Sequence, residues 1–429
     1  MGAALAKANL PHALSEFLRW YAPFQRADGF VPCVVDRDGI DWLVEHDSHG
    51  ELLWGVREAF RAEGDRGFLE AMRQPVERAA DYLLHLRSLR MSAQYTTPER
   101  SACYGLLPES ASHEGYLAHP VHSYWDDFWG IRGLYAAAEL AIALDLPEAA
   151  ERWGNAAAAF LADVQVSLAK VIAERHLEYI PGSVEWADFD PTATANAIAL
   201  LDFAAELPAA PLHKMLETYL AGFRRKHRGE MPWTNYTAYE IRLIGAFVRL
   251  GQRAEANELL DFFLADRRPP AWNQWPEITW QDPRSPGHLG DVPHTWIAAE
   301  YLLALASMVA SERDGTDALV VAGGLPWSWI AEEEGFAVTG LPTRHGLLDV
   351  RIAATGQSRI AIDLGGLPTL PVGGLWLAPP LPVGCRIVAA TTADGEALPL
   401  HGSGTTIIVN KLPLAATLLV GPQEASPHA

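Results

Sequence analysis

Residues 124–173, YWDDFWGIRGLYAAAELAIALDLPEAAERWGNAAAAFLADVQVSLAKVIA, are the stretch that decides the fold of this 429-residue chain. Apolar residues recur every three or four positions over 124–144 and again over 147–173, which is the period of a helix with a buried face. Only residues 145–146 separate the two segments, and Pro147 stands in the first helical turn, where proline is well tolerated. The stretch therefore predicts two long helices that fold back on each other as a hairpin.

The same pattern recurs along most of the chain. Short turns alternate with long loops, at 28–48, 92–123, 174–190, 228–236 and 267–291, that are rich in Trp, Asp, Glu, His and Pro. This alternation predicts stacked helical hairpins with the long loops on one face. No fixed sequence period of the solenoid kind is present, so a closed α/α toroid is favoured. The other helices are expected at 11–27, 49–63, 66–91, 191–206, 211–227, 237–250, 253–266 and 292–310.

The pattern changes after about residue 315. Helical periodicity stops, and short runs rich in Val, Ile and Leu follow, separated by Gly and Pro; they predict strands at 348–353, 358–363, 385–391 and 405–409. We therefore expect a mainly α chain in two domains, an (α/α)6 toroid over 1–314 and a small antiparallel β-sandwich over 315–429. Ten helices are fewer than the twelve of a full toroid, so the first hairpin is expected to be incomplete.

Charge and composition exclude several function classes. The chain has 33 Lys+Arg against 53 Asp+Glu, a net charge of −20, which argues against binding nucleic acid or anionic membranes. Its three cysteines lie far apart and lack the spacing of a zinc site. No secretory signal peptide is visible, which favours a cytoplasmic location. A neutral glycan remains a suitable partner, and no cofactor or metal is expected.

Fifteen tryptophans are the most informative feature of the composition. Many stand beside Asp, Glu, His or Gly in the long loops. Aromatic faces surrounded by carboxylates form a surface on which sugars stack and hydrogen-bond, although large cores also use indoles as filler.

Short motifs make the chain resemble the six-hairpin glycosidases, a superfamily that includes trehalase-like, glucoamylase-like and rhamnosidase-like enzymes. Residues 123–129, SYWDDFW, resemble the Tyr-Trp-Asp signature of the trehalase-like members. Residues 183–190, SVEWADFD, resemble the segment that holds their catalytic acid. Residues 272–277, WNQWPE, followed by His294-Thr295-Trp296, resemble the loop and last inner helix that hold the base. The resemblance implies a toroid followed by a β-sandwich.

Glycoside hydrolysis needs one protonated carboxyl group and one ionised carboxylate. The resemblance implies that Glu277 is the base that activates water. Two candidates for the acid stay open: Asp188, in the loop where trehalase-like enzymes hold theirs, and Glu109, in the loop that glucoamylase-like enzymes use. Glu185 and Asp190 are weaker rivals, and Asp190 precedes Pro191 in a position that suits a helix N-cap.

Further polar and aromatic residues of the long loops are candidates for substrate binding. Structural roles compete with this prediction: Asp126 and Asp127 suit the first turn of a helix through its dipole, and Asp47 or Ser48 suits a cap. His46 and His49 are three apart, but a third metal ligand at useful spacing is missing. The predicted substrate-binding residues are His46, Asp47, Trp125, Asp126, Asp127, Glu185, Trp186, Tyr236, Trp272, Trp275, His294 and Trp296.

Two functional hypotheses follow. The first is a glycoside hydrolase that acts on a neutral oligosaccharide or glycoconjugate, with the inverting mechanism that the resemblance implies. The second is a non-catalytic carbohydrate-binding or structural protein on the same scaffold, because a fold alone does not fix a function. A polysaccharide lyase is a third option, but it needs basic residues beside its uronate, and these loops are acidic.

Overall fold

The computed structural model describes residues 1–113, 115–285 and 292–423. It divides into two compact units, which are described separately. We call residues 2–6 and 10–233 the N-terminal unit, and residues 1, 7–9 and 234–429 the C-terminal unit.

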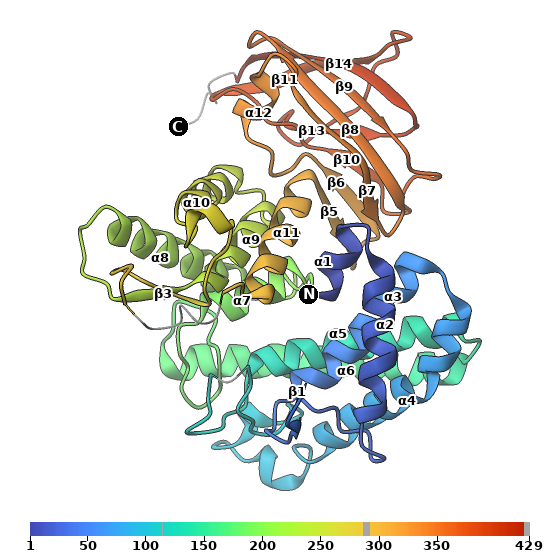
Figure 1. Cartoon of the computed structure of the whole chain (residues 1–429), viewed down its shortest axis with the longest axis vertical. Coiled ribbons are helices and arrows are strands. Elements are labelled where there is room, and N and C mark those ends of the chain that lie inside the picture. Colours follow the sequence, from blue (N-terminus) through green and yellow to red (C-terminus); the bar gives the residue numbers. More distant parts are fainter. Residues whose placement is uncertain (114, 286–291, 424–429) are drawn as a thin grey trace. The chain divides into compact units, whose positions relative to one another are not determined.

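The N-terminal unit is built from helical hairpins (Figure 1). Helix α3 packs against α2, α4 and α5, α5 packs against α6, and α7 packs against α8. The inner helix α5 is apolar nearly all round and is buried along most of its length, whereas α4 and α6 each bury one stripe. The helices are α1 (Gly2–Lys7), α2 (Pro11–Tyr21), α3 (Asp47–Glu63), α4 (Arg66–Ser88), α5 (Tyr124–Ala143), α6 (Pro147–Arg175), α7 (Pro191–Ala199) and α8 (Ala209–His227), with short 3-10 turns at Ala22–Phe24, Ala93–Thr96 and Ser101–Cys103.

Two glycines allow α3 and α5 to approach closely. A Cβ atom at Gly50 would lie 2.1 Å from the carbonyl oxygen of Trp129, and one at Gly133 would lie 2.6 Å from the Cα atom of Gly50. Only glycine fits such a backbone-to-backbone contact. The contact holds the N-terminal ends of both helices, and thus the loops that precede them, close together.

Local signals in the sequence fix the helix ends. Asp190 caps α7, since its Oδ1 atom accepts hydrogen bonds from the backbone amides of Thr192 and Ala193, both at 3.0 Å. The N-cap role of Asp190 is therefore confirmed. Helix α6 begins at Pro147 and α7 at Pro191, as expected, and α3 ends at Gly64 in the left-handed conformation.

The C-terminal unit opens with three helices and a two-stranded sheet. Helix α9 (Arg242–Arg249) packs against α10 (Arg253–Ala265) and α11 (Thr295–Val309). Strands β3 (Asn235–Thr237) and β4 (Ile278–Trp280) pair in antiparallel fashion, with Tyr236 opposite Thr279. The 3-10 turns Ala238–Ile241 and Pro270–Trp272 precede α9 and β4 respectively. The N-terminal unit has its own small hairpin, β1 (Val34–Asp36) with β2 (Gly39–Asp41).

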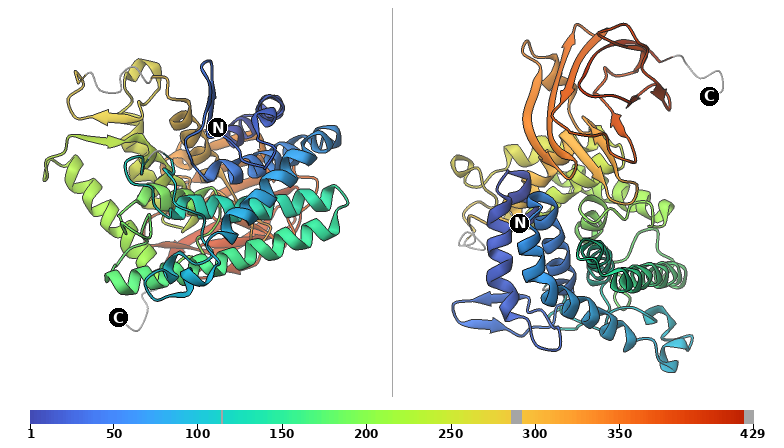
Figure 2. Two further views of the ribbon diagram at one scale, coloured as in Figure 1. Left: turned by 90° about the horizontal axis from the view of Figure 1, so that it is seen from below. Right: turned by 90° about the vertical axis from the view of Figure 1, so that its right-hand side faces the viewer.

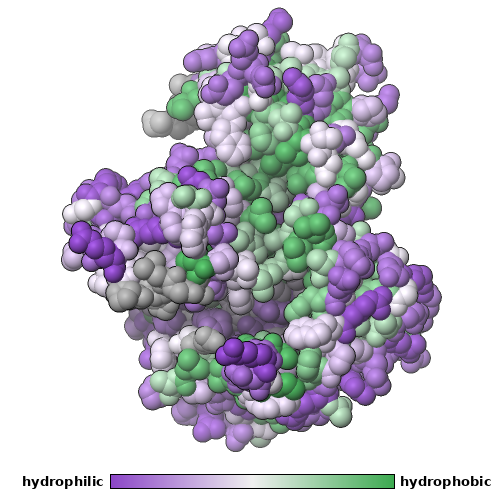
Figure 3. All heavy atoms as spheres, viewed as in Figure 1, coloured by the Kyte–Doolittle hydropathy of each residue, from purple (hydrophilic) through white to green (hydrophobic). Residues whose placement is uncertain are grey.

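Two five-stranded sheets complete the C-terminal unit and face each other across a core of Val, Ile and Leu (Figures 1 and 2). One has the order β12-β13-β10-β6-β5, with β6 and β10 parallel, and the other is the antiparallel sheet β11-β14-β9-β8-β7. In the space-filling view, apolar side chains lie among the strands of this region (Figure 3). The strands are β5 (Ala310–Arg313), β6 (Ala318–Val321), β7 (Phe336–Thr343), β8 (Gly346–Thr355), β9 (Arg359–Gly365), β10 (Leu375–Leu377), β11 (Cys385–Thr392), β12 (Leu400–His401), β13 (Thr406–Val409) and β14 (Leu414–Pro422), with the short helix α12 (Trp327–Ala331) between β6 and β7.

The predicted fold class is confirmed. Each of the ten predicted helices has a counterpart, and the two sheets that follow the helical region are antiparallel except for the β6–β10 pair. Within the described ranges, α6 is also long and apolar enough to cross a membrane, a test that core helices of soluble proteins pass as well.

Candidate functional site

Two long loops of the N-terminal unit lie against each other at the start of α5. Isolated bridges join Ser110 to Val121 and Ser123 to Ser183. The backbone amide of Val184 also donates to the carbonyl of His122 at 3.0 Å. These contacts bring the loops 92–123 and 174–190 together, so three of the predicted carboxylates, Glu109, Glu185 and Asp188, belong to one loop cluster.

Glu109 and Glu185 are joined through the partly buried Arg90 and the buried His122. Arg90 Nη2 donates to Glu109 Oε2, and Arg90 Nε donates to His122 Nε2 at 2.9 Å. His122 Nδ1 lies 2.6 Å from Glu185 Oε1. Partial burial raises the pKa of Glu109, but the hydrogen bond from its own backbone amide, the imidazole of His122 and the ion pair with Arg90 together lower it below its usual value.

Asp188 has a different environment. Its carboxylate accepts hydrogen bonds from the hydroxyls of Tyr116, at 2.9 Å, and Ser183, at 2.7 Å. Asp188 forms no ion pair within the described ranges. Gly182 makes the arrangement possible, because a Cβ atom there would lie 2.7 Å from Asp188 Oδ2. The half-exposed indole of Trp186 meets Tyr116 edge to face, with ring centroids 5.3 Å apart.

A second group of carboxylates is fully enclosed beneath these loops. Trp125 Nε1 donates to Asp47 Oδ2 at 2.7 Å, and Asp126 accepts from the hydroxyls of Ser110 and Ser112 at 2.5 and 2.7 Å. Burial, followed by the nearby charge of Asp47, raises the pKa of Asp126 to about 8. Burial also raises the pKa of Asp47. The folded environment therefore favours the protonated form of Asp126.

Asp127, His46 and His49 are buried as well. Asp127 Oδ1 accepts from the backbone amide of Leu107 at 2.9 Å, which anchors the loop containing Glu109, and burial raises the pKa of Asp127 well above its usual value. The rings of His46 and His49 meet edge to face 6.0 Å apart, and no hydrogen-bond partner for either ring exists in the part of the chain that the structure describes. Burial lowers the pKa of His46 to about 4, so its imidazole is neutral. His46 precedes α3 as its N-cap without a side-chain cap bond, and neither Asp47 nor Ser48 stands at the cap.

In the C-terminal unit, Glu277 lies just before β4. Its backbone carbonyl accepts from the amide of Ala238 at 2.8 Å, and its side chain is partly exposed. Trp275 is buried and its indole donates to the carbonyl of Phe263 at 2.9 Å, while the hydroxyl of Tyr236 donates to Asp266 at 2.6 Å. These contacts tie Trp275 to α10 and Tyr236 to the residue that follows α10. Trp272, by contrast, is 62% exposed.

His294 and Trp296 stand at the start of α11, among groups from the turn before α9. Tyr239 Oη and His294 Nε2 lie 3.2 Å apart, and Trp296 Nε1 donates to Glu300 Oε1 at 3.0 Å. The guanidinium of Arg242 lies 4.3 Å from the ring centroid of Tyr239 and pairs with Glu300. Both predicted residues thus belong to a network of aromatic and charged side chains.

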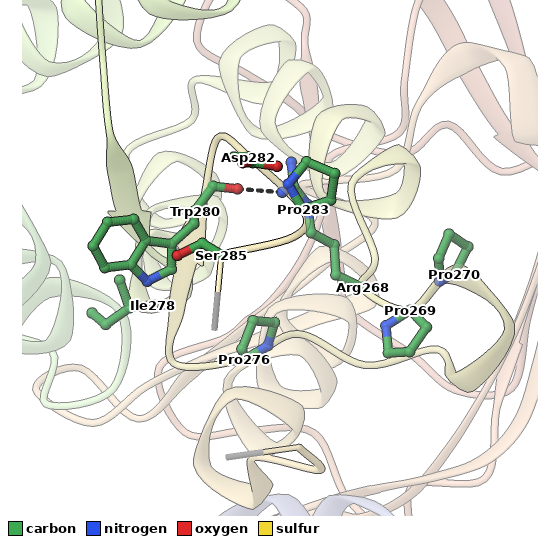
Figure 4. A pocket seen from close by; sticks show the side chains of 9 residues that line it. All are labelled: Arg268, Pro269, Pro270, Pro276, Ile278, Trp280, Asp282, Pro283 and Ser285. Atoms are coloured by element: carbon green, nitrogen blue, oxygen red, sulfur yellow. Dashed lines mark hydrogen bonds between the residues drawn. The ribbon is translucent and has the colours of Figure 1, made fainter. Parts of the chain in front are cut away.

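A cavity of about 290 Å³ lies beside β4 in the C-terminal unit (Figure 4). Its lining is mostly apolar, and Arg268, which lines it, donates to the carbonyl of Trp280. Pro276, Ile278 and Trp280 line it, whereas Glu277 and Thr279 do not, so the alternation of the strand directs Glu277 away from this cavity. The lining residues are Arg268, Pro269, Pro270, Pro276, Ile278, Trp280, Asp282, Pro283 and Ser285.

One group has ligand types that transition metals accept. Atoms of Cys103, His122 and Glu185 lie within 4.8 Å of one another. However, both ring nitrogens of His122 already have partners, and the guanidinium of Arg90 places a fixed positive charge at the same point. Burial also raises the pKa of the Cys103 thiol to about 12, which disfavours the thiolate that a metal needs. The group therefore fits a hydrogen-bond network better than a cation.

Three residues of the site, Arg90, His122 and Tyr116, could not be found from the sequence. Arg90 follows the last turn of α4, where a basic residue is expected for the helix dipole alone, and His122 and Tyr116 stand in no recognisable motif. Only the pairing of the two loops brings these side chains to the carboxylates.

No protein-family model and no curated protein matches this chain. Among solved structures, the chain is similar to an α-L-rhamnosidase from Dictyoglumus thermophilum, with a TM-score of 0.57 and 11% identity over 98% of this chain and 45% of that one. A GH78 family rhamnosidase from Bacillus sp. GL1 matches with a TM-score of 0.44 and 12% identity over 76% of this chain and 31% of that one. The first likeness shows the fold, a helical toroid with β-domains. The chain spans less than half the length of the rhamnosidase that it matches.

Proposed function

We propose that this chain is a glycoside hydrolase that acts on a neutral oligosaccharide or glycoconjugate. The observation that supports this best is the loop cluster of the N-terminal unit, in which Tyr116 contacts both the carboxylate of Asp188 and the half-exposed indole of Trp186, and which also holds Glu109 and Glu185. Carboxylates next to an aromatic face suit both chemistry on a sugar and stacking against its ring. A chain with a net charge of −20 and acidic loops favours neutral over anionic sugars.

In this proposal Glu277 is the general base and Asp188 is the general acid. Glu109 is less suited to the acid role, because its ion pair with Arg90 stabilises the ionised form. Within the described residues, the side chain of Asp188 has only neutral hydroxyl partners, those of Tyr116 and Ser183, and no cation holds it. The reaction is expected to invert the anomeric configuration, by analogy with the superfamily that the sequence resembles.

The substrate test uses the full chain and a panel of nitrophenyl glycosides and neutral oligosaccharides. The panel begins with α-L-rhamnosides, because the structure that matches nearly the whole chain is called an α-L-rhamnosidase. Release of nitrophenolate or reducing sugar supports the proposal, and proton NMR of the first product formed tests inversion. Glycan binding without release from any substrate would contradict it and favour a carbohydrate-binding protein.

The acid assignment has its own test. Asp188→Asn should lower the hydrolysis of glycosides with poor leaving groups by about 10²–10⁴-fold, the usual contribution of general acid catalysis. Substrates with a dinitrophenyl leaving group need little protonation, so their hydrolysis should fall much less. Glu109→Gln, measured in parallel, should not show this dependence on the leaving group. If instead Glu109→Gln shows this dependence on the leaving group and Asp188→Asn does not, the acid is Glu109. The exposed carboxylate variant Asp81→Asn is the matched control.

A further inference from the structure

We propose that Arg90 is a positioning residue that orders the two flanking carboxylates of the site, Glu109 directly and Glu185 through His122. The inference rests on the proposed function for its activity readout, but its structural part concerns the N-terminal unit alone. All four residues belong to that unit.

The geometry of the network fixes the roles of donor and acceptor. An arginine side chain has only N–H donors, so His122 Nε2, at 2.9 Å from Arg90 Nε, must be the acceptor. The proton of the neutral imidazole is then on Nδ1, which donates to Glu185 Oε1 at 2.6 Å. Glu185 Oε2 also accepts from the backbone amide of His122 at 2.9 Å. Arg90 therefore selects the tautomer of His122 whose Nδ1–H holds Glu185 Oε1, while the backbone amide of the same residue holds Oε2.

The four side chains of the network differ in their exposure to solvent. The side chains of Arg90 and His122 are 13% and 3% exposed, whereas those of Glu109 and Glu185 are 43% and 39% exposed. Arg90 is itself held, because its guanidinium lies 5.1 Å from the ring centroid of Tyr95. The guanidinium of Arg90 and the imidazole of His122 thus hold two carboxylates that are accessible to solvent. This arrangement is expected of groups that support a reactive site.

Lysine cannot replace this arginine fully. The Nε and Nη2 donors of Arg90 point to two different acceptors from one planar group. A lysine ammonium keeps the charge beside Glu109 but has no rigid fork with which to serve His122 at the same time. Arg90→Lys therefore keeps the positive charge but removes the planar pair of donors, so it separates the two effects.

The first experiment is nitrogen-15 NMR of the histidine rings at neutral pH, in the wild type, Arg90→Lys and Arg90→Met, with His122→Gln used to assign the signal. In the wild type we expect His122 to be neutral with the proton on Nδ1. In Arg90→Met, Nε2 loses its donor and faces only Glu109 Oε2, at 3.6 Å, so we expect the proton no longer to be fixed on Nδ1 and the nitrogen-15 shifts of both ring nitrogens to change. A His122 signal that is the same in all three proteins would overturn the proposal, and this outcome does not depend on any hydrolase activity.

The second experiment measures kcat and KM on a substrate from the panel. Misplacement of a positioned group by about 1 Å costs about 10²-fold in rate, so Arg90→Met should lower kcat by about that factor with a smaller change in KM, and Arg90→Lys should recover part of it. Arg152→Met, which removes an exposed arginine paired with Asp81, is the control and should match the wild type. Wild-type kcat in a folded Arg90→Met would overturn the positioning role. If Arg90→Met does not fold, Arg90→Lys answers the same question: wild-type kcat together with a wild-type His122 signal would overturn it.

Discussion

Replacing Gly50 with alanine tests the close packing of α3 against α5, on which the position of the candidate site depends. A Cβ atom at residue 50 would lie 2.1 Å from the carbonyl oxygen of Trp129 and 2.4 Å from its carbonyl carbon. These atoms belong to a helix backbone and cannot turn aside as a flexible side chain can. An ordinary contact would require the two helices to separate locally by about 1 Å.

The expected change in the free energy of unfolding follows from two opposing effects. Alanine stabilises a helix interior by about 0.5–1 kcal/mol relative to glycine, whereas overpacking a tight contact costs about 1–3 kcal/mol. Gly55 lies in the same helix and provides the matched control, because a Cβ atom there would meet only the Leu18 side chain, at 3.5 Å. Gly55→Ala should therefore raise the free energy of unfolding by about 0.5–1 kcal/mol. Gly50→Ala should be less stable than Gly55→Ala by the overpacking cost, about 1–3 kcal/mol.

The assay is urea unfolding followed by far-ultraviolet circular dichroism, with the midpoints of the three proteins compared. Gly50→Ala should unfold at a lower urea concentration than Gly55→Ala. Equal midpoints for the two variants would refute the close approach of the two helices at Gly50.

Three further predictions concern stability. Because the pKa of Asp126 is raised to about 8 in the folded protein, the protonated form is favoured there, so the free energy of unfolding should fall as the pH rises from about 5 to about 8. Asp126→Asn should weaken this pH dependence, and an unchanged profile would contradict the assignment. Asp190→Ala should lower the free energy of unfolding by about 1 kcal/mol in urea titrations, through loss of the α7 cap, whereas an unchanged midpoint would exclude a capping contribution. Burial raises the pKa of Glu312, but the charge and hydrogen bond of Lys7, at 2.5 Å, together with the backbone amide and the charge of Arg344, outweigh it and lower the pKa. This contribution is present above the ordinary pKa and is lost as the pH falls through the lowered one, so Lys7→Met should lower the melting temperature at pH 7 and by progressively less as the pH is taken into the acid range.

The sequence predicted the helical part of the fold well for a physical reason. Each helix buries one stripe or its whole circumference, and this leaves a period of three to four residues in the sequence. The strands were harder to predict from the sequence. The predicted segments at 348–353, 358–363, 385–391 and 405–409 match β8, β9, β11 and β13. The strands that were not predicted include β14, although its residues alternate regularly between buried and exposed, and β7, which contains Gly340 and Pro342.

The candidate site could be predicted only in part. The long loops pointed to Glu109, Glu185 and Asp188, and their residues do meet within one unit. The local pattern could not distinguish Asp126, which is enclosed by serine hydroxyls, from the carboxylates that reach solvent. It also could not reveal Arg90 and His122, because their role depends on contacts between residues 19 to 63 positions apart.

The central claim, that this chain hydrolyses glycosides with Glu277 as the base, is tested most directly by one comparison of rates. Wild type, Glu277→Gln and the exposed control Glu333→Gln are measured on the best substrate of the panel. We predict that Glu277→Gln lowers the rate of sugar release by about 10²–10⁴-fold while retaining the wild-type circular dichroism spectrum, and that Glu333→Gln matches the wild type. A Glu277→Gln protein that releases sugar at the wild-type rate would contradict the account.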